Sequence, residues 1–217
     1  MAETVITVQG SFSKHYPAER ADATISVHLE GASRADIIDS VTASADAVRA
    51  AIDASTVDRW SSDRLQTWDE KPWSNDGAQL PVVFHARIGF TVRFSDFEAL
   101  SAWLESVVEL PGVAVDSLTW DVTESTRTAA TAEVRSRAVK DAVAKATIYA
   151  QSIGLGTVTA TAVADPGMLG DSAAPQPGFE PRMAMKVSDS MGGASPLALK
   201  PQQIEVSTAV DARFVAS

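Results

Sequence analysis

Residues 133–156 read EVRSRAVKDAVAKATIYAQSIGLG, and this stretch decides the fold because it predicts a helix, the end of that helix and the strand that follows. Alanines recur along it with charged residues between them, which is typical of an amphipathic helix. Gly154 stands where a residue in the left-handed conformation closes a helix. The Thr, Val and Ala residues from 157 onward predict a strand. The stretch contains no catalytic pattern, so it indicates how the protein is built.

Placing the residues at about 100° intervals gives this helix one broad apolar arc, which is expected to pack on a sheet. The members of the arc are Ala138, Val139, Ala142, Val143, Ala146, Tyr149, Ala150 and Ile153. Arg135 falls inside the arc near its start. Its long side chain either reaches water or pairs with a carboxylate of a partner.

Apolar periodicity predicts the remaining elements. Alternating apolar residues predict strands at residues 4–12, 21–29, 57–68, 82–94, 113–122, 158–162 and 204–214. The first two strands are expected to pair with each other. Apolar residues three and four apart predict helices at 33–52 and 97–108.

Turn and cap signals refine these boundaries. Ser95, with Glu98 three residues later, resembles a capping box and is expected to open the short helix. Residues 75–77, Asn-Asp-Gly, predict the apex of a turn. The apolar parity of strand 113–122 shifts between Val115 and Leu118, which indicates a bulge.

Together these elements predict an α+β fold, in which largely antiparallel sheets are flanked by two longer helices and one short helix. A chain of 217 residues is long enough for one sizeable core, so we expect a single domain over residues 1–217. Five prolines, five glycines and four methionines fall between 165 and 200. That composition predicts a long, irregular and mobile excursion.

Composition and charge exclude several classes of function. The formal net charge is −10, from 28 acidic against 18 basic residues, which disfavours DNA, RNA and anionic lipid as partners. The absence of cysteine excludes disulfides, thiolate nucleophiles and Cys-ligated metals. No run approaches the roughly 18 apolar residues that span a bilayer, so no membrane insertion is expected. The first residues, MAETVITV, show no secretory signal, which favours the cytoplasm, or the cell envelope if a signal was removed.

The chain offers little catalytic chemistry. Its three histidines, at 15, 28 and 85, lack the spacing of a metal site, and His28 and His85 are expected to be solvated on polar strand faces. No nucleophile-elbow, P-loop or dinucleotide motif occurs. We therefore predict no cofactor, no metal and no enzyme. An acid–base hydrolase remains a remote alternative, because an acidic chain offers many carboxylate pairs.

One segment gathers aromatic side chains. Trp60, Trp68 and Trp73 lie close together in the sequence, with Arg59 and Arg64 among them. The functional interpretation is a binding or subunit-contact surface, because tryptophan and arginine are enriched in interfaces. The structural alternative is that Trp60 and Trp68, which share strand parity, pack under a helix.

The order of the elements resembles a known family. ITVQG opens it at 6–10, and ADATISVHL at 21–29 leads into the first helix; FTVRFSD follows at 90–96. The most specific piece is RAVKDAVAKA at 137–146, followed by YA at 149–150 and GLG at 154–156, with IEVS closing the pattern at 204–207. Nearly the whole chain thus resembles the SIMPL-domain family, a former domain of unknown function. That family includes bacterial periplasmic immunogenic and oxidative-stress-defence proteins.

The resemblance implies an α+β domain without established catalytic residues, in a family whose members form large homo-oligomers. Many relatives begin with a signal peptide, whereas this chain starts at its first strand, which favours a cytoplasmic member. We therefore expect a non-enzymatic, self-assembling protein with a binding or scaffolding role related to stress. The alternative is a binding module for a small apolar or aromatic ligand near Trp60 and Trp68.

Overall fold

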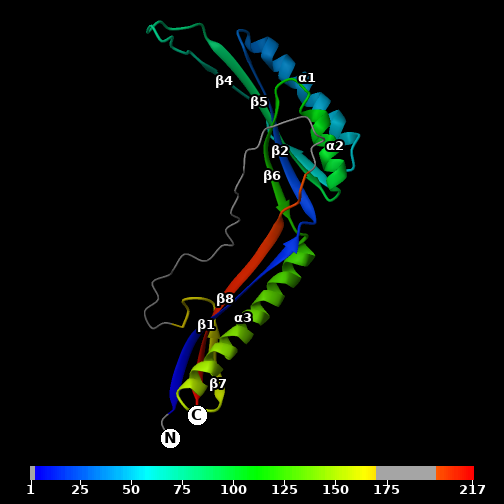
Figure 1. Ribbon diagram of the computed structural model, residues 1–217. Helices are drawn as coiled ribbons and strands as arrows, with labels where there is room; N and C mark the ends of the chain where they lie inside the picture. Colours follow the sequence, from blue (N-terminus) through cyan, green and yellow to red (C-terminus); the bar gives the residue numbers. More distant parts are fainter. Residues whose placement is uncertain (1–2, 170–198) are drawn as a thin grey trace. The chain divides into compact units, whose positions relative to one another are not determined.

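The computed structural model describes residues 3–169 and 199–217, and the chain forms two compact units (Figure 1). The first unit contains β1 (Thr4–Pro17), α3 (Glu124–Ser152), β7 (Val158–Ala164) and β8 (Gln203–Ala216). The second contains β2 (Arg20–Gly31), α1 (Arg34–Asp53), β3 (Arg59–Ser62), β4 (Gln66–Glu70), β5 (Val83–Phe94), α2 (Phe97–Val107) and β6 (Val113–Asp121). Helices and antiparallel sheets in the described ranges confirm the predicted α+β class.

One expectation about organisation differs from what the chain does. The described residues divide into two compact units with a sheet each, and the expectation of a single domain over residues 1–217 stays a prediction. The predicted pairing of strand 4–12 with strand 21–29 is wrong, because β1 pairs with β8 while β2 pairs with β5 and β6. Alternation determines which face of a strand is buried and leaves the partner strand open. Of the predicted excursion at 165–200, residues 170–198 lie outside the described residues.

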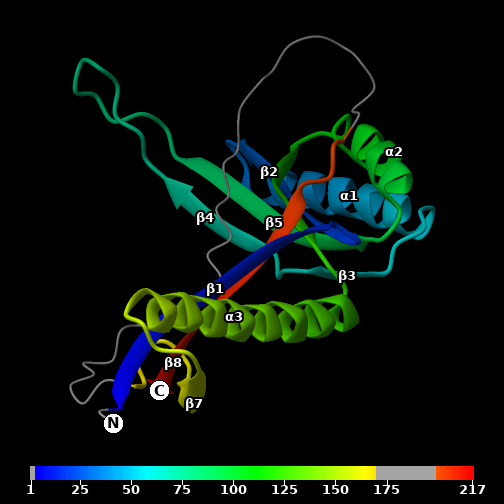
Figure 2. The same cartoon turned by 60° about the horizontal axis from the view of Figure 1, so that its bottom comes forward.

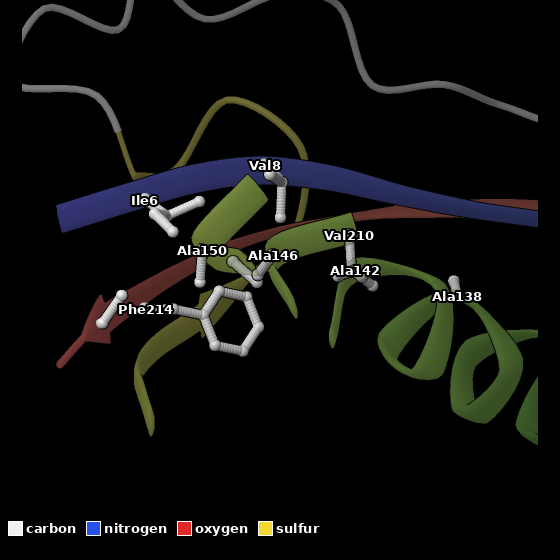
Figure 3. Close-up of a cluster of buried hydrophobic side chains, with 10 residues drawn as sticks. Ile6, Val8, Ala138, Ala142, Ala146, Ala150, Val210 and Phe214 are labelled. Atoms are coloured by element: carbon white, nitrogen blue, oxygen red, sulfur yellow. The ribbon is translucent and has the colours of Figure 1, made fainter. Parts of the chain in front are cut away.

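The first unit is a three-stranded sheet covered by one helix on one face. β8 is the central strand, with β1 and β7 antiparallel to it on either side. Ile6 and Val8 of β1 and Val210 and Phe214 of β8 are buried against α3 (Figure 3). The intervening residues point to the other face, as the period of a strand requires.

Small side chains form the face of α3 that packs on this sheet. The buried residues of the helix are Ala130, Val134, Ala138, Ala142, Ala146 and Ala150. The predicted arc is therefore too broad, because Val143, Tyr149 and Ile153 are exposed. Residues four apart on a helix are displaced by about 40° around its axis. The alanine stripe therefore winds around α3 and follows the twist of the sheet.

Helix and sheet approach each other most closely at Gly10 of β1. A Cβ atom at Gly10 would lie 2.1 Å from the carbonyl oxygen of Ala138 and 2.6 Å from the backbone nitrogen of Ala142. Backbone atoms cannot rotate away as a flexible side chain can, so this position requires glycine. The contact sets the distance between α3 and β1.

Both ends of α3 are capped. The side chain of Thr123 accepts a hydrogen bond from the backbone N–H of Thr126. At the other end Gly154 has a φ of 81°, which confirms the predicted left-handed stop. Its N–H donates to Gln151, and the N–H of Leu155 donates to Ala150. This pair of bonds is a Schellman motif, and Leu155 packs against the core as that motif commonly does.

Two carboxylates of α3 tie the helix to β1 at the margin of the core. Asp141 accepts from the Lys145 ammonium at 2.7 Å and from the backbone N–H of Ser11 at 2.8 Å, and these two bonds hold the pKa of Asp141 below its ordinary value. Glu133 accepts from Lys14 at 2.9 Å and from the Tyr16 hydroxyl at 2.9 Å, which lowers the pKa of Glu133 in the same way. These contacts join segments that are more than a hundred residues apart in the sequence.

The second unit is a five-stranded antiparallel sheet with α1 and α2 on one face (Figure 2). The strands are hydrogen-bonded in the order β3-β5-β2-β6. β4 also pairs with β5, along residues 83–87, whereas β3 pairs with residues 90–93. The even-numbered residues of β5 from 86 to 94 are buried beneath the helices, as predicted. α1 buries the predicted face, and its N-cap Ser33 accepts from the N–H of Asp36.

α2 begins and packs differently from the prediction. Its N-cap is Asp96 rather than Ser95, and the Asp96 carboxylate accepts from the backbone N–H groups of Glu98 and Ala99. Trp103 is buried, which the sequence analysis missed, while Val108 is half exposed beyond the end of the helix. The Trp103 ring packs on Phe94 of β5.

The predicted strand at 57–68 is interrupted. The backbone N–H of Asp63 donates to the carbonyl of Gly89, and β4 begins after this break. The hairpin from β4 to β5 projects from the unit (Figure 2), and Gly77, with a φ of 76°, confirms the predicted turn at its apex. The predicted bulge in β6 is also confirmed, because Asp116 is skipped between the pairs Thr24–Ser117 and Ile25–Val115.

Substituting Gly10 tests the close approach of α3 and β1. Gly10→Ala is expected to lower the free energy of unfolding by about 1–3 kcal/mol, the range typical of an overpacked core. Gly156→Ala is the matched control, because its Cβ would meet nothing closer than Ser217 at 3.8 Å. Urea unfolding of both variants measures the difference. Equal midpoints for the two variants would contradict the contact.

Acid titration tests the anchoring carboxylates. A carboxylate whose pKa is lowered by folding stabilises the protein above its unfolded pKa of about 4, and this stabilisation is lost as the pH falls through the folded value. Asp141→Asn should therefore lower the thermal midpoint at pH 7 and have little effect near pH 2. Asp39→Asn, an exposed position on α1, is the control and should change neither. An Asp141→Asn effect that is the same at both pH values would show that the charge is irrelevant.

Candidate functional site

Polar side chains gather on the face of the second unit's sheet that α1 and α2 do not cover, which we call the open face. It carries the odd-numbered residues of β5 and the even-numbered residues of β2, because the two strands pair in continuous register from Ala21–Phe94 to Gly31–Phe84. Aromatic, charged and hydroxyl side chains occupy successive rows across this face.

A group of three rings occupies one end of the open face. His28 Nε2 and His85 Nδ1 are 3.3 Å apart, while the centroids of the two rings are 5.5 Å apart and their planes differ by 18°. Nearly parallel rings with these distances meet edge to edge and share a hydrogen bond. Trp68 of β4 lies parallel to both, with its ring centroid 5.0 Å from His85 and 5.4 Å from His28.

The environment of His85 selects its tautomer. The residue is only 7% exposed, and its Nε2 has no hydrogen-bond partner among the described residues. Nε2 is without such a partner in either tautomer, so the surroundings of Nδ1 decide. Nδ1 faces His28 and lies 3.5 Å from Glu30 Oε2, which can only accept, and this geometry favours the proton on Nδ1. This leaves the unprotonated Nε2 of His28 to accept the bond.

The bulge in β6 supplies a carboxylate to the middle of the face. Asp116 accepts a hydrogen bond from the Ser26 hydroxyl at 3.1 Å and from Arg87 at 2.9 Å. Ser26 is buried, so its hydroxyl needs this partner. The extra residue of the bulge thus turns Asp116 toward β2 and β5, and joins three strands through side chains.

Arginine and hydroxyl groups occupy the other end. Arg93 donates two hydrogen bonds to the carboxylate of Asp22, directly across from it, and these bonds raise the pKa of Arg93 above its ordinary value against the opposing effect of desolvation. Arg59 of β3 lies opposite Arg93 on the other side. Here the surface has a hollow of about 320 Å³, lined by Asp22, Arg59, Trp60, Ser61, Thr91 and Arg93.

The predicted contact residues do not form one surface. Trp60 pairs with Val92 and packs on Phe90, so it belongs to the helix-covered side. Trp68 pairs with His85 and belongs to the open face. The predicted shared parity is wrong because the break after β3 changes the phase of the strand. Both rings are 40% exposed, so neither is packed under a helix, and they line no common groove.

The other candidates are scattered. Trp73 is 68% exposed at the tip of the β4–β5 hairpin, where it forms a bridge with Gln79. Arg64 is exposed in the link between β3 and β4. Arg135 is exposed on α3, so it lies outside the apolar stripe where it was expected, and it belongs to the first unit.

The sequence analysis missed the ring group. It placed His28 and His85 on polar strand faces and expected both to be solvated, whereas His85 is buried. Strand alternation alone could have put the two histidines on one face if the pairing of β2 with β5 had been known. Asp116 was missed for the same reason, because its role depends on which strand lies beside the bulge.

Comparison with protein families matches residues 6–214 to SIMPL, described as a protein of unknown function (DUF541). The chain belongs to the SIMPL family. The match covers nearly the whole chain and includes elements of both units. No curated protein matches this SIMPL chain.

Two further observations concern the described part of this SIMPL protein. None of its helices within residues 3–169 and 199–217 is both long and apolar enough to cross a membrane. Across the same ranges, no three His, Asp or Glu side chains gather into a group that could hold a metal ion. His28 and His85 of the open face contact each other and Trp68.

Removing the Trp68 ring tests whether the ring group holds β4 to the sheet. Every residue of β4 is exposed, and stacking of aromatic rings contributes about 1 kcal/mol. Trp68→Ala should therefore accelerate amide hydrogen exchange severalfold in residues 66–70. Trp73→Ala removes a more exposed tryptophan from the same hairpin and should leave that exchange unchanged. Equal protection of β4 in both variants would show that the stack is incidental.

Proposed function

We propose that this SIMPL protein is non-enzymatic, associates with further copies of itself through the first unit, and acts as a binding scaffold. The observation that carries the proposal is the arrangement of α3 and β7. Apart from Val134, the residues that the helix buries are alanines, whereas Val143, Ile148 and Tyr149 are exposed. A surface helix usually turns its larger apolar residues toward the core.

The exposed apolar side chains concentrate where α3 ends. Ile148, Tyr149 and Ile153 are 59%, 55% and 59% exposed within the last turns of the helix. β7 follows directly and contacts α3, and its Val163 is 51% exposed. Large apolar side chains grouped in this way are typical of interaction surfaces in soluble proteins.

The strand beside them offers hydrogen bonds to a partner. β7 is an edge strand, and its outer backbone groups pair with no strand among the described residues. Its sequence, VTATAVA, contains no charge and no proline, which are two of the devices that prevent edge-to-edge pairing. A third device, a bulge, would act only locally, because the register of β7 with β8 shifts once, between Ala160 and Ala162. A second copy of the same strand is the simplest complement, because two antiparallel β7 strands would form a symmetric interface.

The proposal of a non-enzymatic role is supported by how the charged groups are used. Three carboxylates described above already accept hydrogen bonds from neighbouring side chains. Asp22 accepts from Arg93, Asp116 accepts from Ser26 and Arg87, and Glu133 accepts from Lys14 and Tyr16. Carboxylates held in such pairs stabilise strand and helix contacts and are not available for proton transfer. A stress-related role is part of the same proposal and rests on the family resemblance alone.

Size-exclusion chromatography with light scattering tests the association. The wild-type chain should elute as a multiple of 22.9 kDa, and Val163→Lys should shift it to the monomer, because a lysine beside the β7 edge opposes strand pairing. Val115→Lys is the matched control: Val115 is also a half-exposed valine on an edge strand, in the second unit. A monomeric wild type, or equal effects of the two substitutions, would overturn the proposal.

The non-enzymatic part has its own test. Generic glycoside and ester substrates should show no turnover above that of a heat-denatured sample. Turnover that is lost on replacing one of the carboxylates Asp22, Asp116 or Glu133 would make the protein a hydrolase and contradict this part of the proposal.

A further inference from the structure

We propose that the open face binds an oxyanion of the phosphate class in the hollow at Arg59, Ser61 and Thr91. The site lies wholly in the second unit and does not depend on the proposed association of the first. The inference rests on the Arg59 guanidinium, which pairs with no carboxylate among the described residues, on hydroxyl donors beside it, and on space for a ligand above both.

The charge comes from two arginines in register. Arg59 and Arg93 are directly opposite each other in the antiparallel pair of β3 and β5. Like charges directly opposite each other destabilise a sheet. Asp22 compensates the charge of Arg93, so the charge that an anion in the hollow would compensate is that of Arg59.

Three carboxylates near the hollow already have hydrogen-bond partners. Asp22 accepts both bonds from Arg93. Asp121 accepts from Arg20 at 2.7 Å, and Asp58 accepts from the Ser95 hydroxyl. Asp58 and Asp121 also act on Arg93 through their charge.

Arg59 is left as the free cation of the group. It is exposed, and it has neither an ion pair nor a hydrogen bond with any residue in the described part of the chain. It stands at an edge strand, where its guanidinium can reach a ligand without displacing another side chain.

Hydroxyl groups supply the remaining donors. Ser61 is opposite Thr91, Thr91 is opposite Thr24, and Thr24 is opposite Ser117, so one row across four strands is made of hydroxyl residues. Ser61 and Thr91 of this row line the hollow beside Arg59. A guanidinium with adjacent hydroxyls matches the several acceptor oxygens of a phosphate.

The size of the hollow bears on the ligand. At about 320 Å³ it exceeds what a single inorganic ion requires, so a phosphomonoester with a small organic group also fits. Inorganic phosphate and a phosphomonoester both present a terminal oxyanion to Arg59. Inorganic phosphate and a simple alkyl phosphate distinguish whether the hollow recognises the oxyanion alone or the attached group as well.

Thermal unfolding at constant ionic strength, with inorganic phosphate as the probe, tests the site. The wild-type midpoint should rise with phosphate and saturate, because a ligand that binds only the folded state stabilises it. Arg59→Gln should raise the midpoint without phosphate, because the like-charge pair is relieved, and should abolish the phosphate response. Thr91→Val should weaken that response without relieving the charge pair.

Arg64→Gln is the matched control. It removes the same charge five residues away, from an exposed link that does not line the hollow, and its response to phosphate should equal that of the wild type. Amide chemical shifts should move with phosphate at residues 59–61 and 91–93. A wild type without a saturable response, or an Arg59→Gln variant that responds as the wild type does, would overturn the proposal. An alkyl phosphate that binds no better than phosphate would show that only the oxyanion is recognised.

Discussion

The contact of α3 with Gly10 is the constraint on which the first unit depends. The backbone of Ala138 and Ala142 lies where a side chain at position 10 would be, so helix and strand lie closer together than any side chain at position 10 would permit. The stripe of alanines along α3 follows from this separation, because larger side chains would push the helix off the sheet. The same requirement accounts for the exposure of Val143, Ile148 and Tyr149 on α3. Close packing thus both builds the core and creates the surface that we propose for association.

In the second unit, β5 contributes side chains to both the core and the open face. The even-numbered residues of β5 form the core beneath α1 and α2, and the odd-numbered residues carry the ring group, Arg87 and Arg93 on the open face. Alternation makes this division possible, because neighbouring side chains point to opposite faces. Gly89 marks the middle of the strand, where the Asp63 carboxylate occupies the space that a side chain would need. The open face is therefore separated into an aromatic end and an arginine end.

Local patterns predicted the elements well. Alternation located β5 and β8, helical spacing located α1 and α3, and Gly154 and Asn75–Gly77 marked the correct turns. The errors arose where the outcome depended on a partner. Tyr149 and Ile153 are apolar and lie near the stripe of α3, yet the twist of the sheet leaves them exposed. Trp60 and Trp68 were predicted to face the same side because no sequence signal marks the interruption between β3 and β4, where the backbone N–H of Asp63 bonds to Gly89.

The sequence by itself determined the α+β class, the positions of most helices and strands, and which face of β2, β5 and β8 is buried. Membership of the SIMPL family was also readable from it. Only the tertiary structure decided that β1 pairs with β8 rather than β2, that His28 meets His85, and that Arg59 faces Arg93. The reason is physical: periodicity is a property of one strand, whereas a hydrogen-bonded register is a property of two strands that lie far apart in the chain. Side chains that meet through such a register have no signature in either segment alone.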